Sequence, residues 1–502
     1  MHDDVSHVRL GTQRPRCCTS MARTVARSAL LCLICWAVLA PAYAGTGAVL
    51  ARVEMTAAVR ASGLPVHELL QDGAGRGYAL VLAAHAALDA SDCAFTILAT
   101  NAAAQDIVIA RTRRPAVHAE LARAPECLYD DGRHVVLRRT AAFMARRAQY
   151  DVMLRALPRA PLQWDVPAPR AAAFSCVSNP AIAAMINAVT SNRVWQVIAQ
   201  LSGEIPFTVG ASSYTMYSRH TRNGSPFQKD AAYILQSMTN LGYATQYFRW
   251  SRAGYVSSNV IAVKTGTTLS NEIVLLVAHL DNMPSSGRAP GADDNASGCA
   301  ALVLAAEQCA PHTFQRTLQF AFVTGEEQDL YGSAAYATAL TAQAAHVVAV
   351  FNFDMVAYST QPTRIFGVHT RLASHPRYAH DLPLAQLYTN VMKTYAIDAA
   401  NARIVADGEL YSDHASFWDR GYPAVLAIED YDDFNDDYYH TSNDRLQYCN
   451  PAYCTAVIKG AVGTAAHAAQ LVPEPGAALA WLAMWCLLQR AARRRVCLSY
   501  LT

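Results

Sequence analysis

Carboxylates and one histidine follow three apolar segments of the chain, at the points where each segment ends. These residues are His279 and Asp281 after 273–278, Glu326 and Glu327 after 318–323, and Asp354 after 346–353. A further pair, Asp293 and Asp294, stands in a glycine-bounded loop that opens a helix. A mixed set of imidazole nitrogen and carboxylate oxygen suits Zn²⁺, with Mn²⁺ and Co²⁺ as rivals. The pattern predicts a metal site, provided that folding brings these groups together.

The segments that carry these residues alternate with helical ones. Residues 273–278, 318–323 and 346–353 are continuously apolar, and residues 300–306 and 334–340 between them have helical patterns. Such strands belong to a sheet that helices cover on both faces, as in an α/β fold. Ligands of these sheets gather beyond the carboxyl ends of the strands, where the acidic residues stand. Two further helices are predicted upstream, over 179–203 and 224–242.

Length and composition indicate a globular protein of more than one domain. The chain has 502 residues, 52% of them hydrophobic and 16% charged, with a net charge of +2. This balance argues against a nucleic-acid partner, which would favour a basic surface. Residues 45–170 alternate short apolar runs with polar turns and predict a small α+β domain. The proline-rich stretch 157–169 at its end is the best candidate for a linker.

Six segments, in this order, carry a resemblance to a known family: AHLDN, PGADDNASG, FVTGEEQDLYGS, FNFDM, YSDHASF and YYHTSND. They resemble the two-zinc exopeptidases of the bacterial leucyl aminopeptidase type, relatives of the secreted streptomycete aminopeptidase. The resemblance covers residues 176 to about 470. It implies a metallopeptidase domain over 176–470, a three-layer α/β/α fold with a mixed, mostly parallel central sheet.

The resemblance also assigns roles to residues. It implies two zinc ions and five metal ligands, which are His279, Asp294, Glu327, Asp354 and His440. His279 and Asp354 would hold one zinc, Glu327 and His440 the other, and Asp294 would bridge both. Glu326 would be the general base, and the Asp281 carboxylate would accept the second ring N–H of His279. The peptide bond after Asp294 would be cis.

Other residues leave alternatives open. Tyr439 matches a tyrosine that polarises the substrate carbonyl in part of the family, or it is a packed aromatic. His414 is a rival metal ligand by type, but the resemblance makes it structural. Met355 lies in an apolar specificity pocket or in the core. The acidic run 429–437 forms a rim that attracts a peptide ammonium, a calcium site or a solvated loop.

The resemblance implies a zinc aminopeptidase that releases amino-terminal residues, most readily apolar ones, from peptide substrates. A carboxypeptidase or glutaminyl cyclase of the same fold is an alternative. A catalytically inactive surface scaffold is another, although all five ligand positions and the base are filled. The domain over 45–170 is either a propeptide that occludes the site until cleavage in the linker or a permanent binding module.

Both ends of the chain resemble sorting signals. Residues 1–44 predict a signal peptide cleaved after Ala44, with Met21 as an alternative start, and an uncleaved anchor as the competing interpretation. Residues 472–502 combine a Pro-Glu-Pro triplet, an apolar stretch and four arginines, and resemble a PEP-CTERM sorting tail. The expected partners are signal peptidase and an exosortase-like enzyme, with transient membrane contact. The expected location is exported, secreted or in the cell-surface matrix of a Gram-negative bacterium.

Seven cysteines lie between these signals. Cys449 and Cys454 are close in sequence and predict a disulfide, and Cys93 and Cys127 are a second candidate pair. Cys299 and Cys309 stand in an apolar helical run, which favours buried free thiols.

Overall fold

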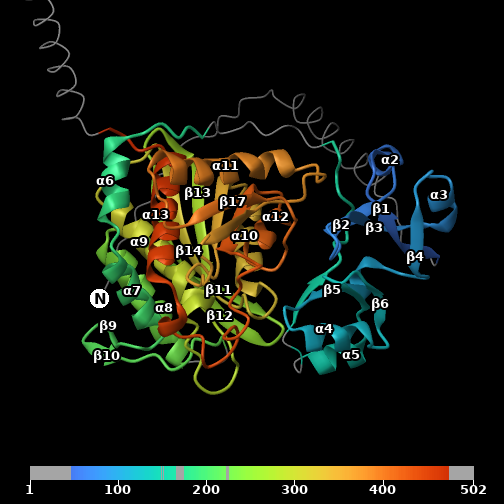
Figure 1. The fold of residues 1–502 in the computed structure, drawn as a ribbon, viewed down its shortest axis with the longest axis horizontal. Coiled ribbons are helices and arrows are strands. Elements are labelled where there is room, and N and C mark those ends of the chain that lie inside the picture. The colour runs from blue at the N-terminus through green and yellow to red at the C-terminus, as the bar shows by residue number, and fades with distance from the viewer. Residues whose placement is uncertain (1–46, 148–149, 151, 166–173, 222–224, 474–502) are drawn as a thin grey trace, which may run out of the picture.

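The computed structural model describes residues 47–147, 150, 152–165, 174–221 and 225–473, which fold into a smaller amino-terminal domain and a larger domain (Figure 1). The predicted signal peptide, the start at Met21 and nearly all of the predicted sorting tail lie outside these residues. Among the described helices, none combines the length and the apolar character that crossing a membrane requires.

The amino-terminal domain contains two antiparallel four-stranded sheets. The first has the order β2-β3-β1-β4 and the second β6-β7-β5-β8. Its strands are β1 (Ala48–Glu54), β2 (Val66–Gln71), β3 (Gly77–Ala84), β4 (Phe95–Ala99), β5 (Ile107–Arg111), β6 (Cys127–Asp130), β7 (Val135–Arg138) and β8 (Met153–Ala156). Its helices are α2 (Ala57–Ala61), α3 (His85–Asp89), α4 (Pro115–Ala122) and α5 (Ala141–Arg146), with a 3₁₀ turn, η1 (Ala104–Asp106).

The larger domain is built on an eight-stranded sheet of order β11-β12-β14-β13-β15-β18-β16-β17. Its strands are β11 (Ala244–Arg252), β12 (Tyr255–Lys264), β13 (Leu269–His279), β14 (Arg316–Val323), β15 (His346–Phe353), β16 (Ile365–His369), β17 (Asn401–Val405) and β18 (Ala424–Glu429). Four of the seven strand pairs are parallel. The predicted mixed, mostly parallel α/β fold is therefore confirmed. A separate hairpin pairs β9 (Phe207–Val209) with β10 (Ser212–Tyr214).

Helices cover both faces of the central sheet. One face packs against α6 (Pro180–Ala188), α7 (Ser191–Leu201), α8 (Ser225–Asn240), α9 (Gly298–Cys309), α11 (Tyr378–Thr394) and α13 (Pro451–Ala468). The other face packs against α10 (Tyr331–Ala342) and α12 (His414–Trp418). Strand β13 shows why both faces are covered, since Leu276 faces the first layer and Leu275 and Val277 the second. This double burial explains the uninterrupted apolar runs in the sequence.

Three sequence predictions need correction, one helix and two disulfides. The segment predicted as one helix over 179–203 forms two helices, because the backbone is extended at Val189 and Thr190. Thr190 caps α7 by accepting a hydrogen bond from Arg193 N at 3.3 Å. Both predicted disulfides are wrong, since the cysteines involved are free thiols. Cys454 is buried in α13 while Cys449 precedes the helix, and Cys93 and Cys127 belong to different apolar clusters. The buried free thiols predicted at positions 299 and 309 are confirmed.

Candidate metal centre and active site

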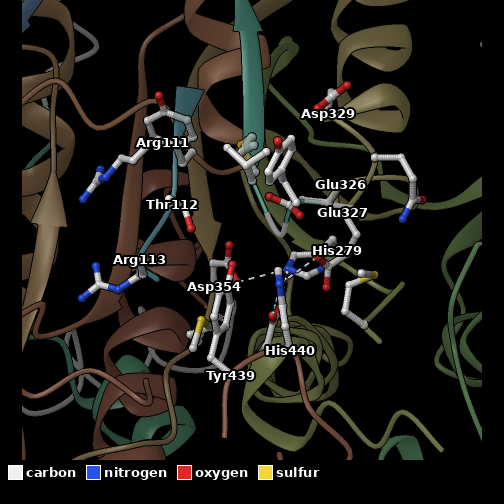
Figure 2. A pocket seen from close by; sticks show the side chains of 18 of the residues that line it. Arg111, Thr112, Arg113, His279, Glu326, Glu327, Asp329, Asp354, Tyr439 and His440 are labelled. Carbon is white, nitrogen blue, oxygen red and sulfur yellow. Dashed lines mark hydrogen bonds and ion pairs between the residues drawn. The ribbon is translucent and has the colours of Figure 1, made fainter. Parts of the chain in front are cut away.

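The predicted site residues stand at one edge of the central sheet. His279 ends β13, Glu326 and Glu327 follow β14, and Asp354 follows β15. Asp294 comes from the one-turn segment η3 (Ala292–Ser297), which leads into α9, and its peptide bond to Asn295 is cis, as the resemblance implies. The last group, His440, comes from the loop between β18 and α13. These groups line one cavity of about 470 Å³ (Figure 2).

Two groups of donors share the Asp294 carboxylate. His279 Nε2 lies 3.2 Å from Asp294 Oδ1 and 3.1 Å from Asp354 Oδ1. His440 Nε2 lies 3.2 Å from Asp294 Oδ2 and 2.9 Å from Glu327 Oε2. In each group the ligand atoms lie within 4.8 Å of one another. Each oxygen of Asp294 thus faces a different imidazole, which is the geometry of a carboxylate that bridges two cations.

The chemistry of these donors fits bound cations. Glu327 Oε1 is buried and has no hydrogen-bond partner among the described residues. Burial raises the pKa of Glu327 to about 7, and the negative charge of Asp294 acts in the same direction. Several buried carboxylates at one point are costly unless cations compensate them. His279, Asp354 and Asp294 could hold one ion, and His440, Glu327 and Asp294 a second.

Asp281 contacts both the metal-ligand candidate His279 and the expected base Glu326, but its contact with His279 differs from the predicted one. His279 Nδ1 donates to the main-chain oxygen of Asp281 at 3.0 Å, whereas the Asp281 carboxylate lies 3.9 Å away. The carboxylate is engaged elsewhere, since it accepts hydrogen bonds from Glu326 N at 3.3 Å and Thr221 Oγ1 at 3.0 Å. Asp281 therefore fixes the tautomer of His279 through its backbone and positions Glu326 through its side chain.

Glu326 is a further carboxylate of the cavity. Its side chain is buried, and burial raises its pKa well above the usual range, reinforced by the charges of Glu327 and Asp354. Glu326 also forms a group with His279 and Glu327 that is compact enough to bind an ion. The geometry therefore permits two roles for Glu326, a proton acceptor beside the metals or a metal ligand.

Supporting residues that sequence reasoning missed hold the ligands in place. Both oxygens of the buried Asp444 carboxylate accept backbone hydrogen bonds, from Asp293 N at 3.0 Å and Asp294 N at 2.9 Å. Ser412 Oγ donates to Asp354 Oδ2 at 2.7 Å. Asp444 and Ser412 stand in the YYHTSND and YSDHASF segments, so the motifs contained them without revealing their contacts.

Arg219 is a third residue that the sequence analysis missed. Its side chain is fully buried and donates to the main-chain oxygens of Leu280 at 2.8 Å, Pro290 at 2.7 Å and Gly291 at 2.9 Å. It thereby joins the exit of β13 to the loop that carries Asp294. No local signal in the sequence identifies it, because three of its carbonyl partners lie more than 60 residues downstream and the fourth, Leu201 O at 2.5 Å, lies 18 residues upstream.

Replacement of Arg219 by glutamine is expected to destabilise the protein strongly. The shorter amide cannot reach all four carbonyls, and each buried carbonyl left unpaired costs about 1–3 kcal/mol. Urea unfolding measures the change. The half-exposed Arg288, which donates to Gly203 O at 3.2 Å, provides the control, and its glutamine variant should change the unfolding free energy by less than about 0.5 kcal/mol. Equal losses in both variants would contradict the role of Arg219.

Part of the cavity lining is apolar. Met355 is buried with Leu426, Ile428 and Phe434, and Tyr431 and Tyr439 pack against this cluster. The Tyr439 ring stacks on His440, with 3.7 Å between ring centroids. Tyr439 is thus both a packed aromatic and a residue of the cavity wall, so its two interpretations are compatible.

His414 and the acidic run lie outside the metal groups. His414 Nε2 donates to the main-chain oxygen of Glu409 at 2.7 Å, and the ring packs against Trp418. In the acidic run, Glu429 is buried, and Asp433 accepts hydrogen bonds from Thr360 N and Gln361 N at 2.8 and 2.9 Å. The run is therefore tied into the structure through specific contacts.

Comparison with known proteins gives the class to which this fold and site correspond. Residues 259–464, which lie within the larger domain, match the model of peptidase family M28. The chain is 30% identical over 210 residues to leucine aminopeptidase 1 of Arthroderma otae, which covers 39% of this chain and 53% of that protein. It is 29% identical over 300 residues to leucine aminopeptidase 1 of Trichophyton rubrum, and this match covers 55% of this chain and 76% of that protein. The chain thus spans about half the length of the first of these curated relatives.

Solved structures share the fold. The aminopeptidase LapA of Legionella pneumophila superposes with a TM-score of 0.56 at 20% identity, over 73% of this chain and 99% of LapA. A glutaminyl cyclase of Macrostomum lignano superposes with a TM-score of 0.51 at 19% identity, over 61% of this chain and 97% of that protein. At these identities the likeness concerns the fold, which proteins of both activities have.

Proposed function

We propose that the protein is a zinc-dependent aminopeptidase that binds two zinc ions and releases apolar amino-terminal residues from peptides. The observation that carries this proposal is the Asp294 carboxylate, whose two oxygens face His279 and His440 in separate donor groups. Glu326 lies beside both groups, and the apolar cluster around Met355 supports the preference for apolar side chains. The leucine aminopeptidases among the relatives support the same substrate class.

Each residue of the site would have a separate role in hydrolysis. Bound zinc ions would lower the pKa of water and polarise the scissile carbonyl. Glu326 would accept a proton from the attacking water and deliver it to the leaving amine. Asp281 holds Glu326 in place through the backbone hydrogen bond described above, and Tyr439 would orient the substrate carbonyl from the cavity wall. The Met355 cluster would enclose the amino-terminal side chain and exclude water from it.

Hydrolysis of leucine anilide tests this function. The zinc-loaded protein should release the chromophore from the free-amine substrate, and acetylation of the amine should lower kcat/KM by about a hundredfold or more, because a site built around a polar group rejects analogues that lack it. Cleavage of amino-blocked peptides alone would instead indicate a carboxypeptidase. Loss of ammonia from glutaminyl peptides, followed by mass spectrometry, would indicate a cyclase.

We further propose export from a Gram-negative cell, with removal of residues 1–44 by signal peptidase and processing of the 472–502 tail by an exosortase-like enzyme. The Ala42-Tyr43-Ala44 sequence and the arginine-rich end support this proposal. Amino-terminal sequencing of the natural protein should begin at Gly45. A first residue at or before Met21 would show that no signal peptide is removed.

A further inference from the structure

The amino-terminal domain contributes directly to the cavity that contains the metal ligands. Strand β5 and the residues that follow it bring Arg111, Thr112 and Arg113 to one side of the cavity, across from Glu326 and His279 (Figure 2). Met144 of α5 and Met153 of β8 line the same cavity. The substrate pocket is therefore formed by both domains.

The residues Arg111, Thr112, Arg113, Met144 and Met153 form a wall of the cavity that the amino-terminal domain supplies. Ion pairs connect this wall and its domain to the peptidase domain, and in these pairs the arginine belongs to the amino-terminal domain and the carboxylate to the peptidase domain. Arg147 pairs with both oxygens of Asp329, only two residues beyond Glu327. Arg113 donates to Tyr431 O at 3.1 Å and lies 3.6 Å from the ring centroid of Phe434. Further pairs between the two domains are Arg111 with Glu409, Arg113 with Asp436, Arg133 with Asp407 and Glu409, and Arg155 with Asp419.

The pair of Arg111 with Glu409 lies largely out of contact with solvent. The Glu409 side chain is fully buried, and the Arg111 side chain is only 11% exposed. Charges with so little solvent around them are screened much less than surface charges. In addition, one apolar cluster is continuous across the boundary, from Leu70 and Leu157 of the amino-terminal domain to Leu410 and Trp418. Separation would expose this apolar surface, so the wall is a stable part of the structure.

We propose, on the basis of the aminopeptidase function above, that this wall restricts hydrolysis to short peptides. The cavity of about 470 Å³ falls within the range of pockets that enclose a drug-sized ligand, about 300–1,000 Å³. A ten-residue peptide extends to roughly 33–36 Å. Such a chain must leave the cavity past residues that the ion pairs hold in place, whereas a dipeptide or tripeptide fits inside.

The proposal is tested by leucine release from free-amine peptides of two, three and ten residues. With the full-length, zinc-loaded protein, kcat/KM for the ten-residue peptide should be at least about tenfold lower than for the dipeptide. The double variant Met144→Ala/Met153→Ala trims the wall, and Arg147→Ala releases one of its ties. Both should raise the ratio of kcat/KM for the long peptide to that for the short peptide by about tenfold. This ratio does not depend on the fraction of protein that is folded.

Arg193→Ala is the matched control, because Arg193 forms a similar ion pair with Glu307 inside the peptidase domain, and its ratio should equal that of the unaltered protein. Equal kcat/KM for all peptide lengths would overturn the proposal, as would an unchanged ratio in both wall variants. A uniform increase for all lengths in Arg147→Ala would indicate a general inhibitor and not a size filter.

The outcome remains interpretable if the proposed activity is absent. The dissociation constants of the same peptides are measured by calorimetry on the zinc-loaded Glu326→Gln protein. If no peptide is hydrolysed by the unaltered protein but the dipeptide binds at least about tenfold more tightly than the ten-residue peptide, the aminopeptidase function fails and the size restriction stands. Equal binding of both lengths would overturn the restriction.

Discussion

Replacement of Glu326 by glutamine is expected to lower kcat by about 10²–10⁴-fold, the usual contribution of a general acid–base group. Glutamine has nearly the same shape, but it cannot accept a proton from water or pass one to a leaving amine. KM for leucine anilide should change little, since the Met355 cluster and the metal ligands remain. The measurement is steady-state hydrolysis of leucine anilide, combined with elemental analysis of bound zinc.

The zinc analysis decides between the two roles that the geometry leaves to Glu326. A general base can be lost without loss of metal, so the variant should keep the zinc content of the unaltered protein. A metal ligand cannot be replaced without loss of metal. Lower zinc content together with lower activity would therefore make Glu326 a ligand in its group with His279 and Glu327. Glu204→Gln, at a partly exposed glutamate near Arg288, is the control and should retain full activity.

The central strands and the ligands at their ends could be predicted from the sequence because both signals are local. Strands buried on two faces are continuously apolar, which identifies β13, β14 and β15, and a residue that follows such a strand must lie at the sheet edge. The edge strand β11 escaped prediction for the opposite reason. Most of its residues are exposed or half-exposed, so polar residues interrupt its pattern.

Contacts between distant residues could not be predicted in this way. The Asp444 carboxylate binds backbone groups about 150 residues away, and Arg147 pairs with Asp329 across 182 residues. Neither residue differs in type or spacing from an ordinary surface charge. The sequence therefore left open whether the first domain covers the site, whereas the structure brings Thr112 into the cavity. The Asp281 contact was predicted with the correct residue but with its carboxylate in place of its carbonyl.

Replacement of Asp294 by alanine is expected to remove metal from both halves of the site. Each oxygen of this carboxylate lies 3.2 Å from a different imidazole, so one substitution takes a ligand from both donor groups. Loss of an outer-shell partner typically costs about 10–100-fold in metal affinity, and loss of a shared ligand should cost more. After dialysis against a weak chelator, the zinc content should fall from two ions per chain to less than one, and activity should fall with it.

The variant Asp444→Asn provides an intermediate loss of metal affinity with which Asp294→Ala can be compared. It retains one oxygen acceptor for the backbone of Asp293 and Asp294 but loses the other, so its metal affinity should fall by about 10–100-fold, less than in Asp294→Ala. Excess zinc should restore activity to Asp444→Asn but not to Asp294→Ala. The control Asp89→Asn, on the exposed helix α3, should bind zinc normally. Two tightly bound zinc ions in Asp294→Ala would contradict the bridging role, because no carboxylate would then be required between the two imidazoles.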